Sequence, residues 1–154
     1  ELRAGHFYEF LYREKIWPQH ILYTAEDIER FEDMRRRGVF AEEHPACLLV
    51  IGSYAGEQEG TTEELREKYA TVDFERFPWA ACCFGPQEHA VMLEAMEMGG
   101  HIRIGFENNV LLNDGNSAEN NAQLIRQFHS AAGNSARKPA TAEQVRAYIA
   151  ARPA

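Results

Sequence analysis

The stretch GGHIRIGFENN, residues 99–109, alternates apolar and polar residues in the manner of a β-strand with two different faces. One face would be apolar and consists of Ile102, Ile104 and Phe106. The other would be largely polar and consists of His101, Arg103, Gly105 and Glu107. The apolar face suits a covering layer of helices. The arginine and the carboxylate on the opposite face have to be explained by the architecture of the sheet.

Four apolar runs of the chain read as strands, and a helical pattern follows each of them. The strands are predicted at 20–24, 46–53, 77–85 and 101–106. The helices are predicted at 24–38, 61–70, 86–99, 117–133 and 141–151. Three helices begin with the spacing of a capping box, formed by Thr24 and Asp27, Thr61 and Glu64, and Thr141 and Gln144. This alternation predicts the α/β class with a parallel sheet.

Two architectures have this order of elements, an open doubly wound sheet and part of a (β/α)8 barrel. Buried strands of an open parallel sheet are apolar on both faces, whereas the interior of an enzymatic barrel tolerates polar groups. The polar face of 101–106 therefore favours the barrel, with Glu107 at the catalytic, carboxyl end of its strand. A complete barrel takes about 250 residues. We expect residues 1–154 to form a single unit, a partial barrel of four βα units plus a C-terminal helix, which another part must close.

The composition limits the partners and the compartment. The 154 residues are 45% hydrophobic and carry a net charge of −8, which is typical of a globular domain and argues against a duplex nucleic-acid surface. Neither a secretory signal nor an apolar run of roughly 20 residues is present, so we expect a cytoplasmic protein without membrane contact. Three cysteines, Cys47, Cys82 and Cys83, lie in apolar strand patterns and are predicted to be buried free thiols.

Three segments resemble the β-keto acid cleavage enzyme family, which includes 3-keto-5-aminohexanoate cleavage enzyme. Residues 99–125, GGHIRIGFENNVLLNDGNSAENNAQLI, are similar to the family's signature near the C-terminus. The segments LLVIGSYAG at 48–56 and FPWAACCFG at 77–85 are similar to its sixth and seventh strands. The resemblance covers essentially 18–145. It implies a zinc-dependent barrel, of which this chain supplies the C-terminal half, strands five to eight.

The resemblance also implies an activity and roles for particular residues. Such enzymes cleave a β-keto acid with acetyl-CoA and give acetoacetate and a new CoA thioester. By position, Glu107 is the metal ligand and Arg103 assists the catalytic carboxylate. Asn108 stands where the family often has an aspartate as general base, and an amide has no useful basicity at neutral pH. Ser53 and Tyr54, just after the second strand, could contact the keto acid or CoA, or could pack the loop.

The chain lacks the paired His-x-His ligands that the family has in an early strand. Its histidines are scattered, and a catalytic zinc takes about three protein ligands. We therefore expect a missing N-terminal half or a companion chain to supply the other ligands, and we expect a homo-oligomer. Two alternatives stay open: a non-catalytic homologue or interaction fragment on the same scaffold, which Asn108 and the absent histidine pair suggest, and an open-sheet domain that binds a small phosphorylated ligand. Arg103 and Glu107 could also form only a buried ion pair within the barrel.

Overall fold

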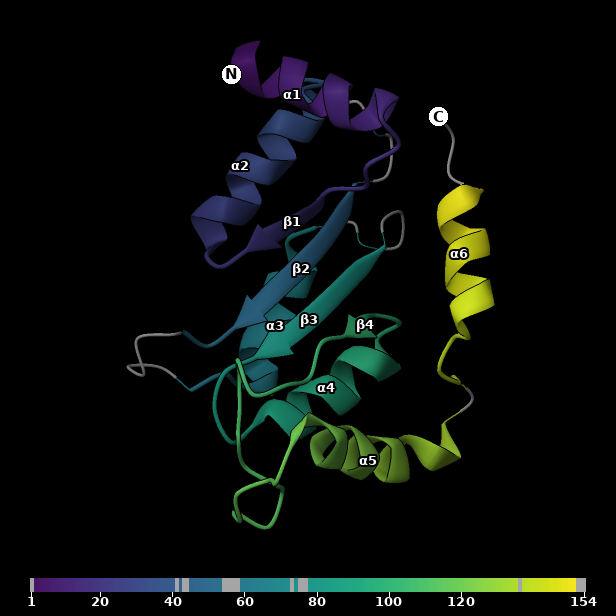
Figure 1. Cartoon of the computed structure of the whole chain (residues 1–154). Coiled ribbons are helices and arrows are strands. Elements are labelled where there is room, and N and C mark those ends of the chain that lie inside the picture. The colour runs from purple at the N-terminus through teal and green to yellow at the C-terminus, as the bar shows by residue number, and fades with distance from the viewer. Residues whose placement is uncertain are drawn as a thin grey trace.

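A computed structural model describes residues 2–40, 42, 45–53, 59–72, 74, 78–135 and 137–151 of the chain (Figure 1). In chain order its strands are β1 (Gln19–Leu22), β2 (Ala46–Ile51), β3 (Trp79–Cys83) and β4 (His101–Ile102). Its helices are α1 (Leu2–Arg13), α2 (Ala25–Arg36), α3 (Thr62–Ala70), α4 (Glu88–Glu97), α5 (Asn121–Ala131) and α6 (Ala142–Ala150), with a short 3-10 helix, η2 (Ala132–Asn134), after α5. The predicted alternation of strands and helices is confirmed.

The capping residues start three helices, although one predicted capping box forms only in part. Thr24 and Asp27 exchange reciprocal hydrogen bonds at the start of α2, and Thr141 and Gln144 do the same at α6. At α3 the Thr61 hydroxyl accepts from the Glu64 backbone N–H. The Glu64 carboxylate instead accepts hydrogen bonds from the Gly52 backbone N–H and from Lys68. A tertiary contact has replaced the local one.

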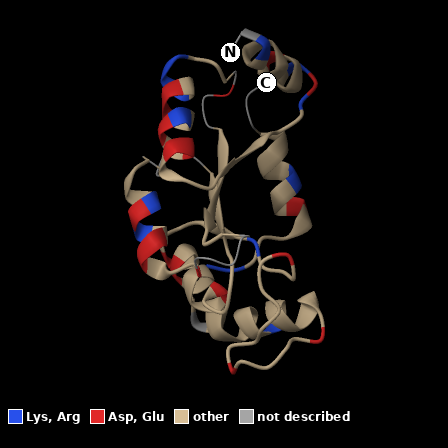
Figure 2. Ribbon diagram, turned by 90° about the vertical axis from the view of Figure 1, so that its left-hand side faces the viewer, with Lys and Arg blue, Asp and Glu red and all other residues tan. Residues whose placement is uncertain are grey.

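The four strands pair in the order β1-β2-β3-β4, and every pair is parallel. Neighbours in the sheet are therefore also neighbours along the chain, as in a barrel, whereas an open doubly wound sheet reverses its strand order at a switch point. The strands contain no Lys, Arg, Asp or Glu, and these charged residues lie on helices and loops (Figure 2). The chain is thus an α/β protein whose parallel sheet agrees with a partial barrel-like fold.

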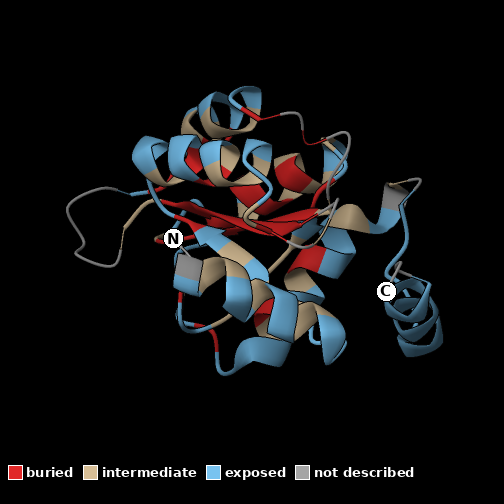
Figure 3. Ribbon diagram, turned by 90° about the horizontal axis from the view of Figure 1, so that it is seen from above, coloured by how far each residue is buried: buried red, intermediate tan, exposed pale blue. Residues whose placement is uncertain are grey.

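Buried residues gather in the strands and on parts of the helices around them (Figure 3), and the larger of two core clusters lies on one face of the sheet. That face packs against α2, α3, α4 and α5, through buried residues that include Ile28, Phe31, Leu65, Val91, Met92 and Phe128. A smaller cluster on the opposite face consists of Leu48, Val50, Ala80, Cys82 and Phe84. All three cysteines are buried and free, as predicted. Burial raises the pKa of the Cys47 and Cys83 thiols to about 12.

The fourth strand is shorter than predicted. β4 ends at Ile102, and one further ladder bond runs from the Arg103 N–H to the Ala81 carbonyl. The chain then turns, because the Gly105 carbonyl accepts hydrogen bonds from the N–H groups of Asn108 and Asn109. Ile102 and Ile104 pack against the helix-side core as expected, but Phe106 is 40% exposed, so its predicted place on that face is wrong. The turn interrupts the two-residue alternation before Phe106.

The sheet face opposite the helices is partly open along β1. Ile21 and Tyr23 are about half exposed there, beside the buried Leu48 and Val50. α6 lies apart from the helices that cover the core, and its described residues are exposed (Figure 1). An apolar sheet face of this kind is normally covered in parallel folds. The assignment of these strands as five to eight of a barrel stays a prediction.

Candidate functional site

The predicted site residues after β4 come together at the carboxyl end of the sheet. Arg103 lies directly beyond β4, and its Nη2 atom is 3.2 Å from Oε1 of Glu107 and 3.4 Å from Oδ1 of Asn108. The same nitrogen is 3.5 Å from the Cys82 sulfur on β3. The side chains of Arg103 and Glu107 are 39% and 54% exposed. The ion pair that the sequence suggested is therefore formed, but it lies at the surface of the described chain and is open to a ligand.

Asn108 is buried and its amide has a defined orientation. Arginine can only donate hydrogen bonds, so the atom that faces Arg103 is the oxygen, Oδ1. The amide nitrogen Nδ2 is buried without a hydrogen-bond partner among the described residues, and so is Nε of Arg103. Buried donors in native proteins are almost always paired. Two unpaired donors on adjacent side chains therefore mark a place where an oxygen of a ligand could bind.

Glu88, in the first turn of α4, is a member of this region that the sequence reasoning missed. Its side chain is turned away from solvent, and the residue is 2% exposed. Oε1 accepts from the Gly105 N–H at 3.3 Å, and Oε2 accepts from Nδ2 of Asn109 at 3.3 Å. Burial raises the pKa of Glu88 to about 7, and these two hydrogen bonds oppose the rise. The sequence did not single out Glu88, because an acidic residue in the first turn of a helix is common and by itself does not indicate a site.

Ser53 follows β2 at the same end of the sheet. The residue before it, Gly52, donates its N–H to the Glu64 carboxylate at 2.9 Å. Lys68 pairs with Glu64 and donates to the carbonyls of Tyr23 and Val50, all at 2.7 Å. We call Arg103, Glu107, Asn108 and Cys82 the Arg103 cluster. Among the described residues, Ser53 makes no hydrogen bond to this cluster. Tyr54, the other predicted substrate contact, lies outside the described residues.

The described residues do not by themselves fit a zinc site. No group of three or more His, Cys, Asp or Glu side chains in the described part of the chain could hold a metal ion. A catalytic zinc normally has three protein ligands. Glu107 could provide one carboxylate, and the cation beside it is Arg103.

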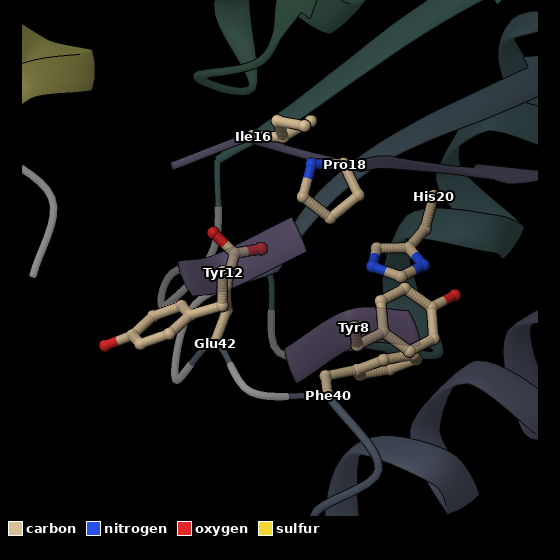
Figure 4. Close-up of a pocket in the computed structure, with 7 residues that line it drawn as sticks. All are labelled: Tyr8, Tyr12, Ile16, Pro18, His20, Phe40 and Glu42. Atoms are coloured by element: carbon tan, nitrogen blue, oxygen red, sulfur yellow. The ribbon is translucent and has the colours of Figure 1, made fainter. Parts of the chain in front are cut away.

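A hollow lies at the other end of the sheet, near the amino end of β1 (Figure 4). It is a small hollow, partly open to solvent, and is lined by Tyr8, Tyr12, Ile16, Pro18, His20, Phe40 and Glu42. His20 packs against the rings of Tyr8 and Phe40, and burial lowers the pKa of its imidazole to about 4. Barrel enzymes place their chemistry at the opposite, carboxyl end. The hollow is thus separate from the Arg103 cluster.

Comparison with known proteins agrees with the resemblance of the three segments. The family model described as beta-keto acid cleavage enzyme matches residues 3–150. The chain is also similar to the 3-keto-5-aminohexanoate cleavage enzyme of Fusobacterium nucleatum subsp. nucleatum, with 32% identity over 68 residues. That alignment covers 44% of this chain and 25% of the relative. In the part of the chain that the structure describes, no helix is long and apolar enough to span a membrane.

Proposed function

Since the chain belongs to the β-keto acid cleavage enzyme family, we propose that the full-length protein cleaves a β-keto acid with acetyl-CoA. The acyl part of the keto acid would be transferred to CoA, and its carboxymethyl part would join the acetyl group to give acetoacetate. The products are thus acetoacetate and a new CoA thioester. The name of the Fusobacterium relative supports a β-keto acid as the substrate class. The alignment with that relative is partial, so the activity of the whole protein is a proposal.

The pair of unpartnered donors is the observation that carries this proposal. Cleavage of a carbon–carbon bond next to a ketone places negative charge on oxygen, and preorganised donors in a partly buried site stabilise that charge. Nε of Arg103 and Nδ2 of Asn108 are buried without hydrogen-bond partners among the described residues. We assign both to an oxygen of the keto acid or of the enolate derived from it. Ser53, and Tyr54 by its sequence position, would contact the substrates from the loop after β2.

Two requirements of the reaction are not met by this cluster. The first is a base, because Asn108 has no useful basicity and the proton acceptor must be another group. The second is the metal that the family resemblance implies. Glu107 would be one ligand, and strands beyond the four described ones would contribute the others. In that arrangement the same strands would cover the open face beside Ile21 and Tyr23.

The proposed function predicts a specific product from the full-length protein. Incubation with acetyl-CoA and a panel of β-keto acids that differ in chain length and terminal amino group should give acetoacetate and the matching acyl-CoA thioester, both measurable by mass spectrometry. One or a few members of the panel should react much faster than the rest. Turnover that needs no acetyl-CoA, or thioester formation without acetoacetate, would contradict the proposed reaction.

Asn108→Asp tests whether this position lacks a needed base. We expect turnover to fall, because the substitution removes the Nδ2 donor assigned to the substrate oxygen. The new carboxylate would take the place of Oδ1, 3.4 Å from Nη2 of Arg103, and pair with that guanidinium. A guanidinium at this distance lowers the pKa of a carboxyl group and so weakens it as a base. The exposed Asn113→Asp is the control for the added charge. A gain of about 10²-fold, the usual scale of general base catalysis, would show that the base belongs at position 108.

A non-catalytic homologue is the second candidate function. It is favoured by Asn108 in place of an acidic residue and by the lack of a three-ligand group among the described residues. On this hypothesis Arg103 and Glu107 only join the turn to β4. The absence of turnover with every keto acid, in wild type and Asn108→Asp alike, is its expected result.

A further inference from the structure

The turn that carries Glu107 and Asn108 is held from beneath by one side chain of the preceding βα unit. Glu88 accepts a hydrogen bond from the N–H of Gly105, where the turn begins, and another from the side chain of Asn109, where it ends. Between these two points the Asn108 carbonyl accepts from the Gly85 N–H at 3.2 Å. We infer that Glu88 is a positioning residue, whose carboxylate holds the 105–109 turn so that Glu107 and Asn108 lie beside Arg103.

The geometry distinguishes this role from ordinary stabilisation of a helix start. An acidic side chain in the first turn of a helix usually stays near the helix N–H groups, at the surface. Glu88 is instead 2% exposed, and both of its oxygens accept from residues outside α4. A buried carboxylate is unfavourable unless its oxygens are hydrogen-bonded. The 105–109 turn supplies those bonds, so the carboxylate and the turn stabilise each other.

The orientation of the Asn109 side-chain amide is fixed by its hydrogen bonds to Leu111. Its Nδ2 also donates to the Leu111 carbonyl at 2.7 Å, and its Oδ1 accepts from the Leu111 N–H at 2.9 Å. Rotating the amide of Asn109 would lose both bonds to Leu111. Glu88 therefore faces two fixed donors, the Gly105 N–H and the Asn109 amide. The two donors approach different oxygens of Glu88, and a carboxylate has an acceptor atom at both positions.

Glu88→Gln is the direct test, because it keeps the size of the side chain and turns one acceptor into a donor. The new amide must then face a donor of the turn, which leaves that donor unsatisfied. Hydrogen exchange of the full-length variant should speed up in peptides that span 103–111, on the order of tenfold to a hundredfold relative to wild type. Glu94→Gln, in the same helix but paired with Arg66, is the matched control and should leave exchange in 103–111 unchanged.

A double variant shows whether the contact itself is responsible. In Glu88→Gln/Asn109→Asp the amide at position 88 can donate to the carboxylate at position 109, while its oxygen still accepts from Gly105. We expect exchange in 103–111 to slow again by several-fold relative to Glu88→Gln, although the lost bond to the Leu111 carbonyl prevents full recovery. If Glu88→Gln does not fold, recovery of a folded protein in the double variant is the expected result.

Three results would overturn the inference. The first is an unchanged hydrogen-exchange rate in 103–111 in a folded Glu88→Gln protein. The second is an equal rise of the exchange rate over all helices. The third is a double variant whose exchange in 103–111 is as fast as in Glu88→Gln. The link to catalysis rests on the proposed function: kcat for thioester formation should fall about tenfold to a hundredfold in Glu88→Gln and recover partly in the double variant. An inactive wild type with the expected exchange pattern would remove the proposed function and leave the positioning role intact.

Discussion

We expect Arg103→Met to lower kcat for the proposed acyl-CoA formation by about 10²–10³-fold in the full-length protein, the usual effect of removing one preorganised charge-stabilising group. The physical reason is the position of the guanidinium. Nη2 is hydrogen-bonded to Glu107 and Asn108, while the buried Nε has no partner among the described residues and is the donor that we assign to a substrate oxygen. Methionine keeps much of the apolar stem and removes every donor. The measurement is steady-state turnover with the preferred keto acid and acetyl-CoA.

Part of the expected loss of turnover in Arg103→Met could come from loss of the partly exposed ion pair with Glu107. Arg66→Met is the control, because Arg66 is also partly exposed and pairs with Glu63 and Glu94 on the helix side of the molecule. It should leave turnover within a few-fold of wild type, since exposed pairs contribute only about 0–1 kcal/mol to stability. Equal losses of turnover in Arg103→Met and Arg66→Met would mean that Arg103 has only a structural role. Arg103→Lys should recover little, because an ammonium cannot reproduce the planar set of donors.

We expect Glu107→Gln to weaken zinc binding to the full-length protein by about one to two orders of magnitude in affinity, because the family resemblance implies that Glu107 is a zinc ligand. A neutral amide oxygen is a poorer ligand than a carboxylate. It can nevertheless accept the hydrogen bond from Nη2 of Arg103, so the 105–109 turn should keep its shape. The measurement is competition with a zinc chelator, followed by elemental analysis of the protein.

The control for this change is Glu119→Gln, which removes an exposed carboxylate from the segment between β4 and α5. Its zinc affinity should equal that of wild type. Unchanged zinc affinity in Glu107→Gln as well would leave Glu107 as the partner of Arg103 alone, and would support the non-catalytic hypothesis. Unchanged hydrogen exchange in 103–111 would show that any loss of zinc comes from the ligand and not from a displaced turn.

The order of the elements could be predicted from the chain because the signals involved are local. The apolar runs of β2 and β3, the threonine caps of α2 and α6, and the alternation of strands with helices depend on residues a few positions apart. The two-residue alternation placed Arg103 and Glu107 on one face at the carboxyl end of the predicted strand, whereas the turn at Gly105 brings their side chains to 3.2 Å. The resemblance of the 99–125 segment then pointed to the family that the comparison confirmed.

Contacts between distant residues decided the rest. β4 stops at Ile102, and the chain turns at Gly105, whose N–H donates to Glu88, 17 residues earlier. Glu64 has the spacing of a capping residue, but its carboxylate binds the loop after β2, 12 residues before it. Local propensity carries no information about a partner so far along the chain. Short-range patterns therefore determined the α/β class. The position of Glu107 and Asn108 depends instead on a long-range contact, in which the buried Glu88 carboxylate gives up water and accepts hydrogen bonds from the Gly105 N–H and the Asn109 side chain.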